Sequence, residues 1–364
     1  MKLGIIGLAK SGKTTVFNAL TRGSASTKAS GLTDPNIGIA KVPDGRLNIL
    51  AEIFNPKKIT QAEVNYIDVP ATPEGLGQDH GISGKYLNEL QTTDALVLVV
   101  RAFENSSVPH VSTNVDPFRD LDTLLIELNL SDVVILERRL SKLDAETKGA
   151  SAAERTRIGK EHSLLESTRQ NLGQGIAIKD QDINQADLTQ LSVFQLLTAK
   201  PLLVLINIGE EQLVDAQQLE NDLNNQIERP GISCIAMCAR LEEELTSMDE
   251  EEEKTFRESL GAGESAYDRA IRSSYELLGL VSFLTVGPDE VRAWTIFDKT
   301  GAAQAAGRIH SDIERGFIRA ETVSFHDLVD SRSMIGAKQK GLVRSEGRNY
   351  LVKDGDVINF LFNV

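Results

Sequence analysis

The stretch "KLGIIGLAKSGKTTVFNAL", residues 2–20, decides the fold of this 364-residue chain. It consists of an apolar strand pattern, then Gly7-x-x-x-x-Gly12-Lys13-Thr14, then a helical pattern. In such a P-loop, glycines let backbone N–H groups turn toward phosphate oxygens, and the next helix presents its positive end to the same anion. The pattern therefore predicts a nucleotide-binding site at the start of the chain.

Each polar side chain of the loop has an expected role. Lys13 should reach the β- and γ-phosphates, and the hydroxyl of Thr14 should bind Mg²⁺. Thr33 is a candidate second magnesium ligand, although such a Thr alone is most often a turn residue. Asp68 is expected to bind the metal through water, with a helix cap or turn residue as the alternative. Lys13 and Asp68 are the predicted catalytic residues. The predicted phosphate contacts are Lys10, Ser11, Gly12, Lys13, Thr14 and Thr15.

Three later apolar runs have the length of strands: "DALVLVVRAF" (94–103), "KPLLVLINIG" (200–209) and "ISCIAMCA" (232–239). Continuous runs of this kind suit strands buried on both faces of a mostly parallel sheet with helices between them. The predicted fold class is therefore an α/β nucleotide-binding domain. Ligands of such sheets lie beyond the carboxyl ends of the strands, where Thr14, Asp68, Asn207 and the Cys238–Ala239 turn should converge.

Composition excludes several classes of protein. A net charge of −14 argues against a general nucleic-acid coat or a membrane-surface protein, but it does not exclude a local contact. No apolar run approaches the roughly 18 residues of a membrane span, and the N-terminal stretch is too short for a signal peptide. We expect a cytoplasmic monomer. Cys234 and Cys238 would lie roughly 13 Å apart in a strand, beyond disulfide reach, and should be reduced thiols.

The middle of the chain has helical periodicity. Between residues 125 and 172, apolar positions spaced by three and four predict two helical arms, separated by the polar stretch "ETKGASAAERT". We interpret this as an antiparallel hairpin inserted in the nucleotide domain, with His162 packed in its seam. The predicted domains are the nucleotide-binding domain at 1–124 and 197–280, the hairpin at 125–196, and a C-terminal domain at 281–364.

The C-terminal domain is neutral, with 11 basic and 11 acidic side chains. Alternating apolar and polar positions in "VRAWTIF", "IRAETVSF" and "DVINFLFNV" predict a small β-grasp-like sheet with one helix. The domain resembles nucleic-acid and ribosome contact modules, which implies that its cations could form a ribosome or RNA footprint; alternatively they are ordinary surface charges and Trp294 belongs to the core. The candidate footprint residues are Arg292, Trp294, Arg308, Arg315, Lys338, Lys340 and Arg344.

Several blocks of the chain resemble the YchF subfamily of Obg-related P-loop proteins, the Obg-like ATPases. They include "TDPNIGIAKVPDGRL" (33–47), "GPDEVRAWTI" (287–296) and "EGRNYLVKDGDVINFLFNV" (346–364). The last two are similar to the family's TGS domain. The resemblance covers essentially the whole chain. It implies a Mg²⁺-dependent nucleotide switch whose hairpin and TGS domain contact the ribosome or RNA.

The nucleotide base is expected to meet Asn207-Ile208-Gly209-Glu210. Guanine-specific relatives carry Asn-Lys-x-Asp, whose Asp accepts hydrogen bonds from the guanine ring N–H and amine. Glu210 is longer, so this two-point match should be lost, whereas Asn207 can still pair with the N6 and N7 edge of adenine. The family's Asn-x-x-Glu is correspondingly linked to ATP. The predicted base contacts are Asn207, Ile208, Glu210, Cys238 and Ala239, with ATP preferred and GTP as the second ligand.

The chain departs from the family pattern at the phosphate end. Lys10 replaces the Asn that helps to hold a monovalent cation, and "DVPA" has Ala71 where the usual element has Gly. No glutamine follows Ala71, so a water-orienting residue is missing and slow hydrolysis is expected.

Three functions remain open from the sequence. The preferred one is a switch that hydrolyses ATP slowly and engages a translation-related partner. The second is a hydrolysis-deficient scaffold that binds ribosomes or nucleic acid and is braced by ATP or GTP. The third, phosphotransfer to an acceptor, ranks last because we identify no acceptor-activating carboxylate or lid arginines.

Overall fold

The computed structural model describes residues 1–23, 35–69, 82, 84–112, 114–227, 232–248, 250–259 and 264–363. The chain divides into two compact units. The first contains residues 1–38 and 65–270, and the second contains residues 39–64 and 271–364.

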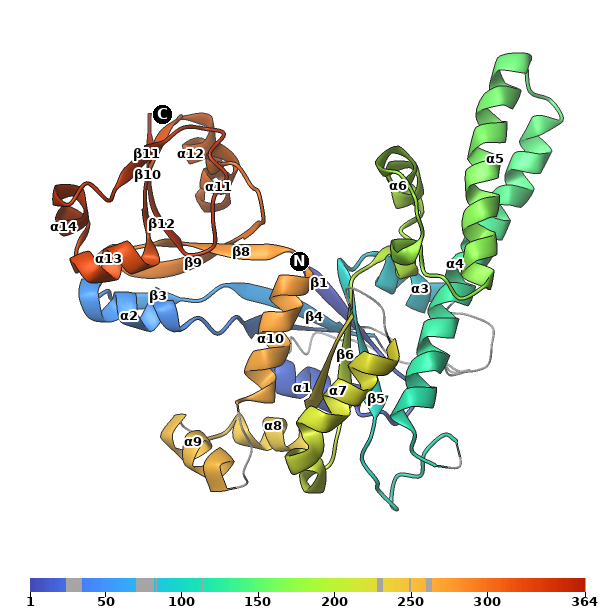
Figure 1. The fold of residues 1–364 in the computed structure, drawn as a ribbon, viewed down its shortest axis with the longest axis horizontal. Helices are drawn as coiled ribbons and strands as arrows, with labels where there is room; N and C mark the ends of the chain where they lie inside the picture. Colours follow the sequence, from blue (N-terminus) through green and yellow to red (C-terminus); the bar gives the residue numbers. More distant parts are fainter. Residues whose placement is uncertain are drawn as a thin grey trace. The chain divides into compact units, whose positions relative to one another are not determined.

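The first unit is built on a six-stranded sheet (Figure 1). Its central strands β5 and β6 are fully buried, and β4, β1, β5, β6 and β7 run parallel to one another. The predicted α/β fold with a mostly parallel sheet is confirmed. In spatial order the strands are β2 (Asn36–Lys41), β4 (Glu63–Asp68), β1 (Lys2–Ile6), β5 (Ala95–Arg101), β6 (Leu202–Asn207) and β7 (Ile232–Met237).

Helices flank this sheet. Helix α4 packs on β5, α7 packs on β7, and α1 packs against both β1 and α8. The α-helices of this part are α1 (Lys13–Thr21), α3 (Gly84–Gln91), α4 (Pro117–Thr147), α5 (Ala152–Gly173), α6 (Gln185–Leu191), α7 (Ala216–Ile227), α8 (Ala239–Leu245) and α9 (Glu250–Ser259). Helix α10 (Ala266–Leu277) begins in this unit and ends in the second. Short 3-10 turns are η1 (Ile178–Asp180), η2 (Ser192–Phe194), η3 (Leu197–Ala199) and η4 (Glu210–Asp215). No helix in these described ranges is long and apolar enough to cross a membrane.

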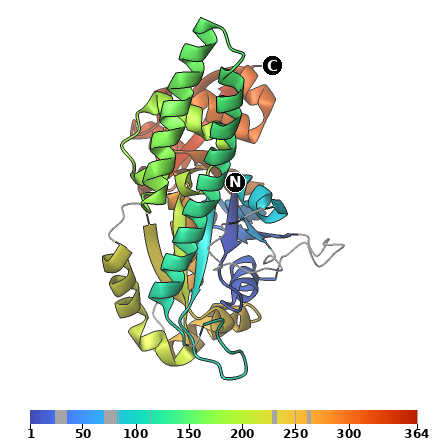
Figure 2. The ribbon, with the colours of Figure 1, turned by 90° about the vertical axis from the view of Figure 1, so that its right-hand side faces the viewer.

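Helices α4 and α5 form the predicted hairpin, in which α5 lies beside the C-terminal part of α4 (Figures 1 and 2). Their shared core contains Leu136, Leu140, Leu143, Ile158, Leu165 and Leu172. The first helix begins eight residues before the predicted start at 125, because the Asp116 side chain accepts from Phe118 N and Arg119 N and Pro117 follows. The prediction for His162 was wrong: its side chain is 40% exposed and faces Asp144, 3.4 Å away.

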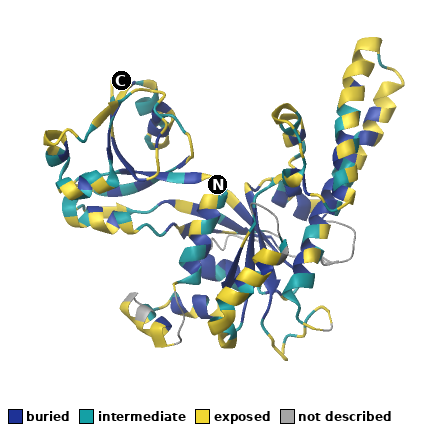
Figure 3. Cartoon of the chain, in the orientation of Figure 1, coloured by how far each residue is buried: buried dark blue, intermediate teal, exposed yellow. Residues whose placement is uncertain are grey.

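The second unit holds another six-stranded sheet, whose order is β11 (Arg344–Glu346), β10 (Phe317–Ser324), β12 (Asp356–Phe362), β8 (Leu280–Thr285), β9 (Glu290–Phe297) and β3 (Lys58–Thr60). Its helices are α2 (Gly45–Phe54), α11 (Ala302–Ile309), α12 (Ser311–Arg315), α13 (Phe325–Ser331) and α14 (Met334–Gln339). Buried residues alternate with half-buried ones along most of β9, as predicted, whereas β10 and β12 contain runs of consecutive buried residues (Figure 3). Four helices follow β9 where the sequence indicated one.

The division of the chain differs from the predicted domain boundaries at residues 39–64 and 271–280, which both belong to the second unit. Strand β3 runs parallel to β9, and the Thr60 hydroxyl donates to Glu290. Arg46, in α2, pairs with Asp354. Residues 39–64 therefore belong to the unit that contains the C-terminal sheet, although the sequence places them between two parts of the P-loop domain.

Candidate nucleotide-binding site

The P-loop connects β1 to α1 and requires glycine at two positions. A side chain at Gly7 would collide with the carbonyl oxygen of Val99. Gly12 has a φ of 87° and forms the N-cap of α1, and a side chain there would collide with Nδ2 of Asn207. The glycines of the motif are therefore fixed by close approach as well as by backbone conformation. The backbone N–H groups in the first turn of α1 have no hydrogen-bond acceptor within the helix, so they can bind an anion.

On one side of the loop, two predicted magnesium residues meet. The Thr14 hydroxyl donates a hydrogen bond to Oδ2 of Asp68, 3.0 Å away, at the carboxyl end of β4. Burial raises the pKa of Asp68, and the Thr14 hydrogen bond, the Lys13 charge and Asn36 act in the opposite direction. Burial likewise lowers the pKa of Lys13, against the attraction of Asp68. An alcohol and a carboxylate are oxygen ligands of the kind that Mg²⁺ takes, so these residues fit the ion.

On the other side of the loop, Asn207 is 5% exposed and engages two backbone groups. Its Nδ2 donates to the carbonyl of Ser11 at 3.0 Å, and its Oδ1 accepts from the N–H of Ala239 at 3.3 Å. The predicted role was pairing with the base. In the structure the amide braces the P-loop against the start of α8. Its second N–H and remaining lone pair are left for a ligand, so the predicted contact with the base stays a prediction.

The other predicted base contacts differ in exposure. Ile208 is 2% exposed, and its N–H donates to the carbonyl of Met237 at 3.1 Å, so its side chain belongs to the core. Glu210 is exposed and opens η4 directly after β6. Cys238 is buried at the N-cap of α8, and burial raises the pKa of its thiol. Of this group, Glu210 has the side chain that solvent and a ligand can reach.

The remaining loop residues are placed as follows. Lys10 is exposed at the top of the P-loop and has a φ of 63°. Thr15 is half-buried in the first turn of α1, next to Thr14. Thr33 and the switch residue Ala71 lie outside the residues that the structure describes.

Two residues near the site were missed from the sequence. Asn36, on β2, hydrogen-bonds to Asp68. Arg101, at the end of β5, is 1% exposed and reaches the P-loop backbone. The sequence contained a signal for Arg101. Arginine is rarely fully buried, so an arginine at the end of a continuous apolar strand indicates that its side chain has specific partners.

Most cations of the predicted ribosome or RNA footprint form ion pairs with carboxylates of the same unit. Lys338 bonds to Glu321 at 3.0 Å, and Arg315 pairs with Asp312. Of the rest, Arg344 pairs with Glu346 and Asp356, Lys340 donates to the carbonyl of Asp330, and Arg308 donates to the carbonyl of Thr295.

Trp294 is partly buried and packs against the core of this unit, which is closer to the alternative interpretation. Its ring stacks on Phe283 with centroids 6.3 Å apart, and its Nε1 donates to the Thr285 hydroxyl at 3.0 Å. Arg292 covers the ring at 3.9 Å from the centroid.

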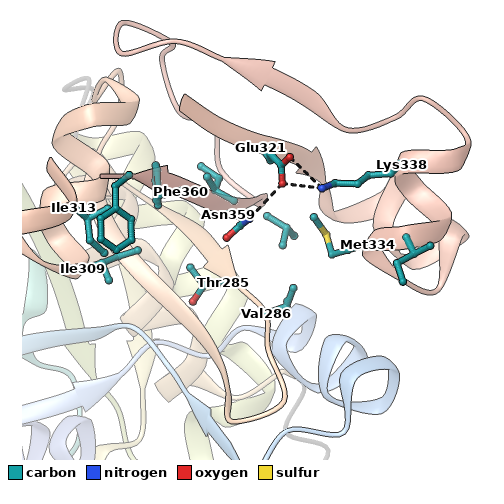
Figure 4. Close-up of a pocket in the computed structure, with 13 residues that line it drawn as sticks. Thr285, Val286, Ile309, Ile313, Glu321, Met334, Lys338, Asn359 and Phe360 are labelled. Atoms are coloured by element: carbon teal, nitrogen blue, oxygen red, sulfur yellow. Dashed lines mark hydrogen bonds and ion pairs between the residues drawn. The ribbon is translucent and has the colours of Figure 1, made fainter. Parts of the chain in front are cut away.

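Thr285 also lines an open groove of about 490 Å³ in this unit (Figure 4). The labelled residues Ile309, Ile313 and Phe360 lie on one side of the groove and Met334 on the other, near the bonded pair Glu321 and Lys338.

Comparison with known proteins gives matches along the whole chain. Residues 2–138 match the family model MMR_HSR1, described as a 50S ribosome-binding GTPase, and residues 280–363 match YchF-GTPase_C, described as a protein of unknown function (DUF933). The chain is 38% identical over 365 residues to the ribosome-binding ATPase YchF of Bacillus subtilis, with 99% of each chain covered.

A second bacterial relative and a solved structure are also similar to this chain over almost its whole length. The chain is 35% identical over 367 residues to the ribosome-binding ATPase YchF of Escherichia coli O157:H7, covering 100% of this chain and 99% of that protein. The structure of the Schizosaccharomyces pombe YchF GTPase superposes with a TM-score of 0.86 at 30% identity, covering 99% of this chain and 97% of that one.

Proposed function

The chain belongs to the YchF family, and on this premise we propose that it is an ATP-preferring nucleotide switch of the cytoplasm. It binds ATP with Mg²⁺, hydrolyses it slowly, and couples its nucleotide state to binding of the ribosome. Its relatives are named ribosome-binding ATPases, which supports both the nucleotide and the partner.

The observation that carries this proposal is a P-loop held from two sides. Asn207 binds the carbonyl of Ser11, and Thr14 is hydrogen-bonded to Asp68. A loop that is held in shape before the ligand arrives loses less conformational entropy on binding. We propose that Lys13 compensates phosphate charge, that Thr14 binds Mg²⁺, and that Asp68 binds it through water. Thr33 remains the proposed second magnesium ligand.

The preference for ATP is proposed from Glu210. It follows β6 where guanine-specific proteins of the predicted class carry Asp, and it is exposed beside the buried Ile208. We also propose the three-part organisation of a nucleotide domain, an inserted hairpin and a C-terminal domain, with residues 39–64 contributing α2 and β3 to the last.

Hydrolysis is tested with purified full-length protein and ATP labelled at the γ-phosphate. We expect slow release of free phosphate that requires Mg²⁺ and disappears in Lys13→Ala. Label transferred to a second molecule would overturn the proposal in favour of phosphotransfer. Binding of ATP and ribosomes without any phosphate release would instead identify a nucleotide-braced scaffold.

The partner is tested by co-sedimentation with ribosomes in three states: no nucleotide, ADP, and a non-hydrolysable ATP analogue. We expect the bound fraction to depend on the nucleotide and to fall as salt rises, since phosphate contacts depend on ionic strength. Because the second unit includes residues 39–64, charge reversal at Arg308 and Lys340 tests the C-terminal contact better than truncation at residue 281 would. Equal sedimentation in all three states would contradict the switch.

A further inference from the structure

Arg101 is the last residue of β5 and one of the largest fully buried side chains of the protein, with 1% of its surface exposed. A buried guanidinium is costly unless its N–H groups are satisfied. Within the described residues, no carboxylate forms an ion pair with it. Its charge is therefore compensated by the dipoles of backbone carbonyl groups. The positions of these carbonyls show which segments the side chain holds in place.

Three backbone carbonyls accept hydrogen bonds from this guanidinium. Nε donates to Phe103 at 3.0 Å, Nη2 donates to Val108 at 2.8 Å, and Nη1 donates to Lys10 at 3.5 Å. The ring of Phe103 stacks on the same group, 4.3 Å from its centroid, and reaches within 3.8 Å of the position that a side chain on Gly12 would take. One side chain therefore joins the top of the P-loop to the loop after β5.

Arg101 also has a partner in this task. It is paired in register with Asn207 across β5 and β6, and Asn207 binds the carbonyl of Ser11. Two neighbouring strand ends thus hold the carbonyls of two consecutive P-loop residues. Ile208, the next residue after Asn207, is apolar and cannot donate a side-chain hydrogen bond to the loop.

Holding these carbonyls fixes the orientation of the two peptide units that follow them. Of their N–H groups, that of Ser11 bonds within the loop, and that of Gly12 is the one offered to a phosphate. In a trans peptide the C=O and N–H point in opposite directions. The carbonyl of Ser11 therefore sets the N–H of Gly12, and the carbonyl of Lys10 sets the N–H of Ser11, which donates to Leu8 at 3.2 Å and closes the turn. Lys10 has a φ of 63°, a left-handed conformation that is unfavourable for a residue with a Cβ atom.

We propose that Arg101 is a positioning residue for the bound nucleotide. Together with Asn207 it keeps the strained P-loop turn in its phosphate-binding shape and fixes the 103–108 loop beside it. This inference rests on the proposed nucleotide-binding function.

The test measures dissociation of a fluorescent N-methylanthraniloyl ATP from full-length protein with Mg²⁺. Arg101→Lys keeps a positive charge but cannot span three separate carbonyls, and we expect its dissociation rate constant to rise at least tenfold. Arg101→Met should raise it further. The matched control is Arg257→Lys, a buried arginine bound to Glu242 and Glu253 away from the P-loop, with a rate within twofold of the parent.

Thermal denaturation without nucleotide separates positioning from stability. A merely structural role would lower the melting temperature of the Arg101 and Arg257 variants alike and leave both dissociation rates near that of the parent. This result, or a folded Arg101→Lys with the parent's rate, overturns the inference. If neither Arg101 variant folds, Phe103→Leu decides: faster release supports the inference and an unchanged rate overturns it. A parent that binds no nucleotide overturns the proposed function as well.

Discussion

Nδ2 of Asn207 donates a hydrogen bond to the carbonyl oxygen of Ser11 across 3.0 Å, and thereby joins the segment proposed to recognise the base to the P-loop. The two residues are 196 positions apart in the chain. Because the same amide accepts a hydrogen bond from Ala239, one side chain connects three segments of the site. Substitutions in the 207–210 segment should consequently alter the conformation of the P-loop and the binding of the phosphates.

Asn207→Asp tests this connection. A carboxylate cannot donate to the Ser11 carbonyl and is repelled by it, so we expect the Kd for Mg-ATP, measured by calorimetry, to rise at least tenfold. The free energy of unfolding should fall by about 1–3 kcal/mol. Asn224→Asp is the control, because Asn224 uses its side-chain oxygen as an acceptor for Cys234 N, and Asp keeps this acceptor. Equal affinities would show that the brace has no bearing on binding.

The second prediction concerns the base. We expect ATP to bind at least tenfold more tightly than GTP, a difference of about 1.4 kcal/mol. Glu210→Asp should reduce the ratio of the GTP and ATP dissociation constants, since the shorter side chain places its carboxylate where it can accept hydrogen bonds from guanine. Glu211→Asp, at the next position of the same 3-10 turn, should leave the ratio unchanged. If Glu210→Asp also leaves it unchanged, backbone groups around Ile208 determine the preference.

The third prediction separates phosphate binding from magnesium binding. Lys13→Ala should abolish tight binding of ATP. The protein should stay folded, because burial lowers the pKa of Lys13 and the substitution removes a charge that is costly to bury. Thr14→Ala removes the hydrogen bond to Asp68 and should chiefly weaken the dependence on Mg²⁺. Thr14→Ser keeps the hydroxyl and should behave like the parent. Two alanine variants that bind Mg-ATP normally would refute the P-loop assignment.

The fourth prediction concerns Lys10. Its ammonium repels a nearby monovalent cation and can supply the positive charge that such an ion would bring to the breaking bond. We expect phosphate release at equal rates in matched potassium and sodium buffers. Lys10→Asn should create potassium dependence, and asparagine tolerates the left-handed backbone found there. Clear stimulation of the unmodified protein by potassium would contradict this role.

The fifth prediction concerns Asp132, which lies in α4 with none of its surface exposed. It accepts hydrogen bonds from Leu197 N, Thr198 N and the Thr198 hydroxyl, yet burial raises its pKa to about 6 from an ordinary 3.8. The folded state therefore holds this proton more tightly than the unfolded state does. The stabilisation is complete below about pH 4 and is lost as the pH rises through about 6.

The measurement is the free energy of unfolding in urea, followed by circular dichroism, for the parent and Asp132→Asn. We expect the stability of the parent relative to this variant to decrease by up to about 3 kcal/mol between pH 4 and pH 7. Asp122→Asn, at an exposed position of the same helix, is the control for the general effect of removing a carboxylate. A difference between parent and Asp132→Asn that does not change with pH would contradict the prediction.

Local patterns in the sequence determined the frame of this protein. The spacing of Gly7, Gly12 and Lys13 predicted the P-loop, and continuous apolar runs predicted the buried parallel strands. Both signals depend on residues close together in the chain, since strand burial and loop conformation are set by local composition. The same reasoning found that Thr14 and Asp68 meet, because the carboxyl ends of parallel strands share one edge of the sheet.

The tertiary structure alone decided how individual side chains are used. Sequence patterns assigned Asn207 to the base and Arg101 to no role, and they placed β3 in the nucleotide domain. Hydrogen bonds to Ser11 and Lys10 and the pairing with β9 join segments far apart in the chain. A side chain with several donors and acceptors binds whichever partners the fold brings within about 3 Å, and local sequence does not contain that information.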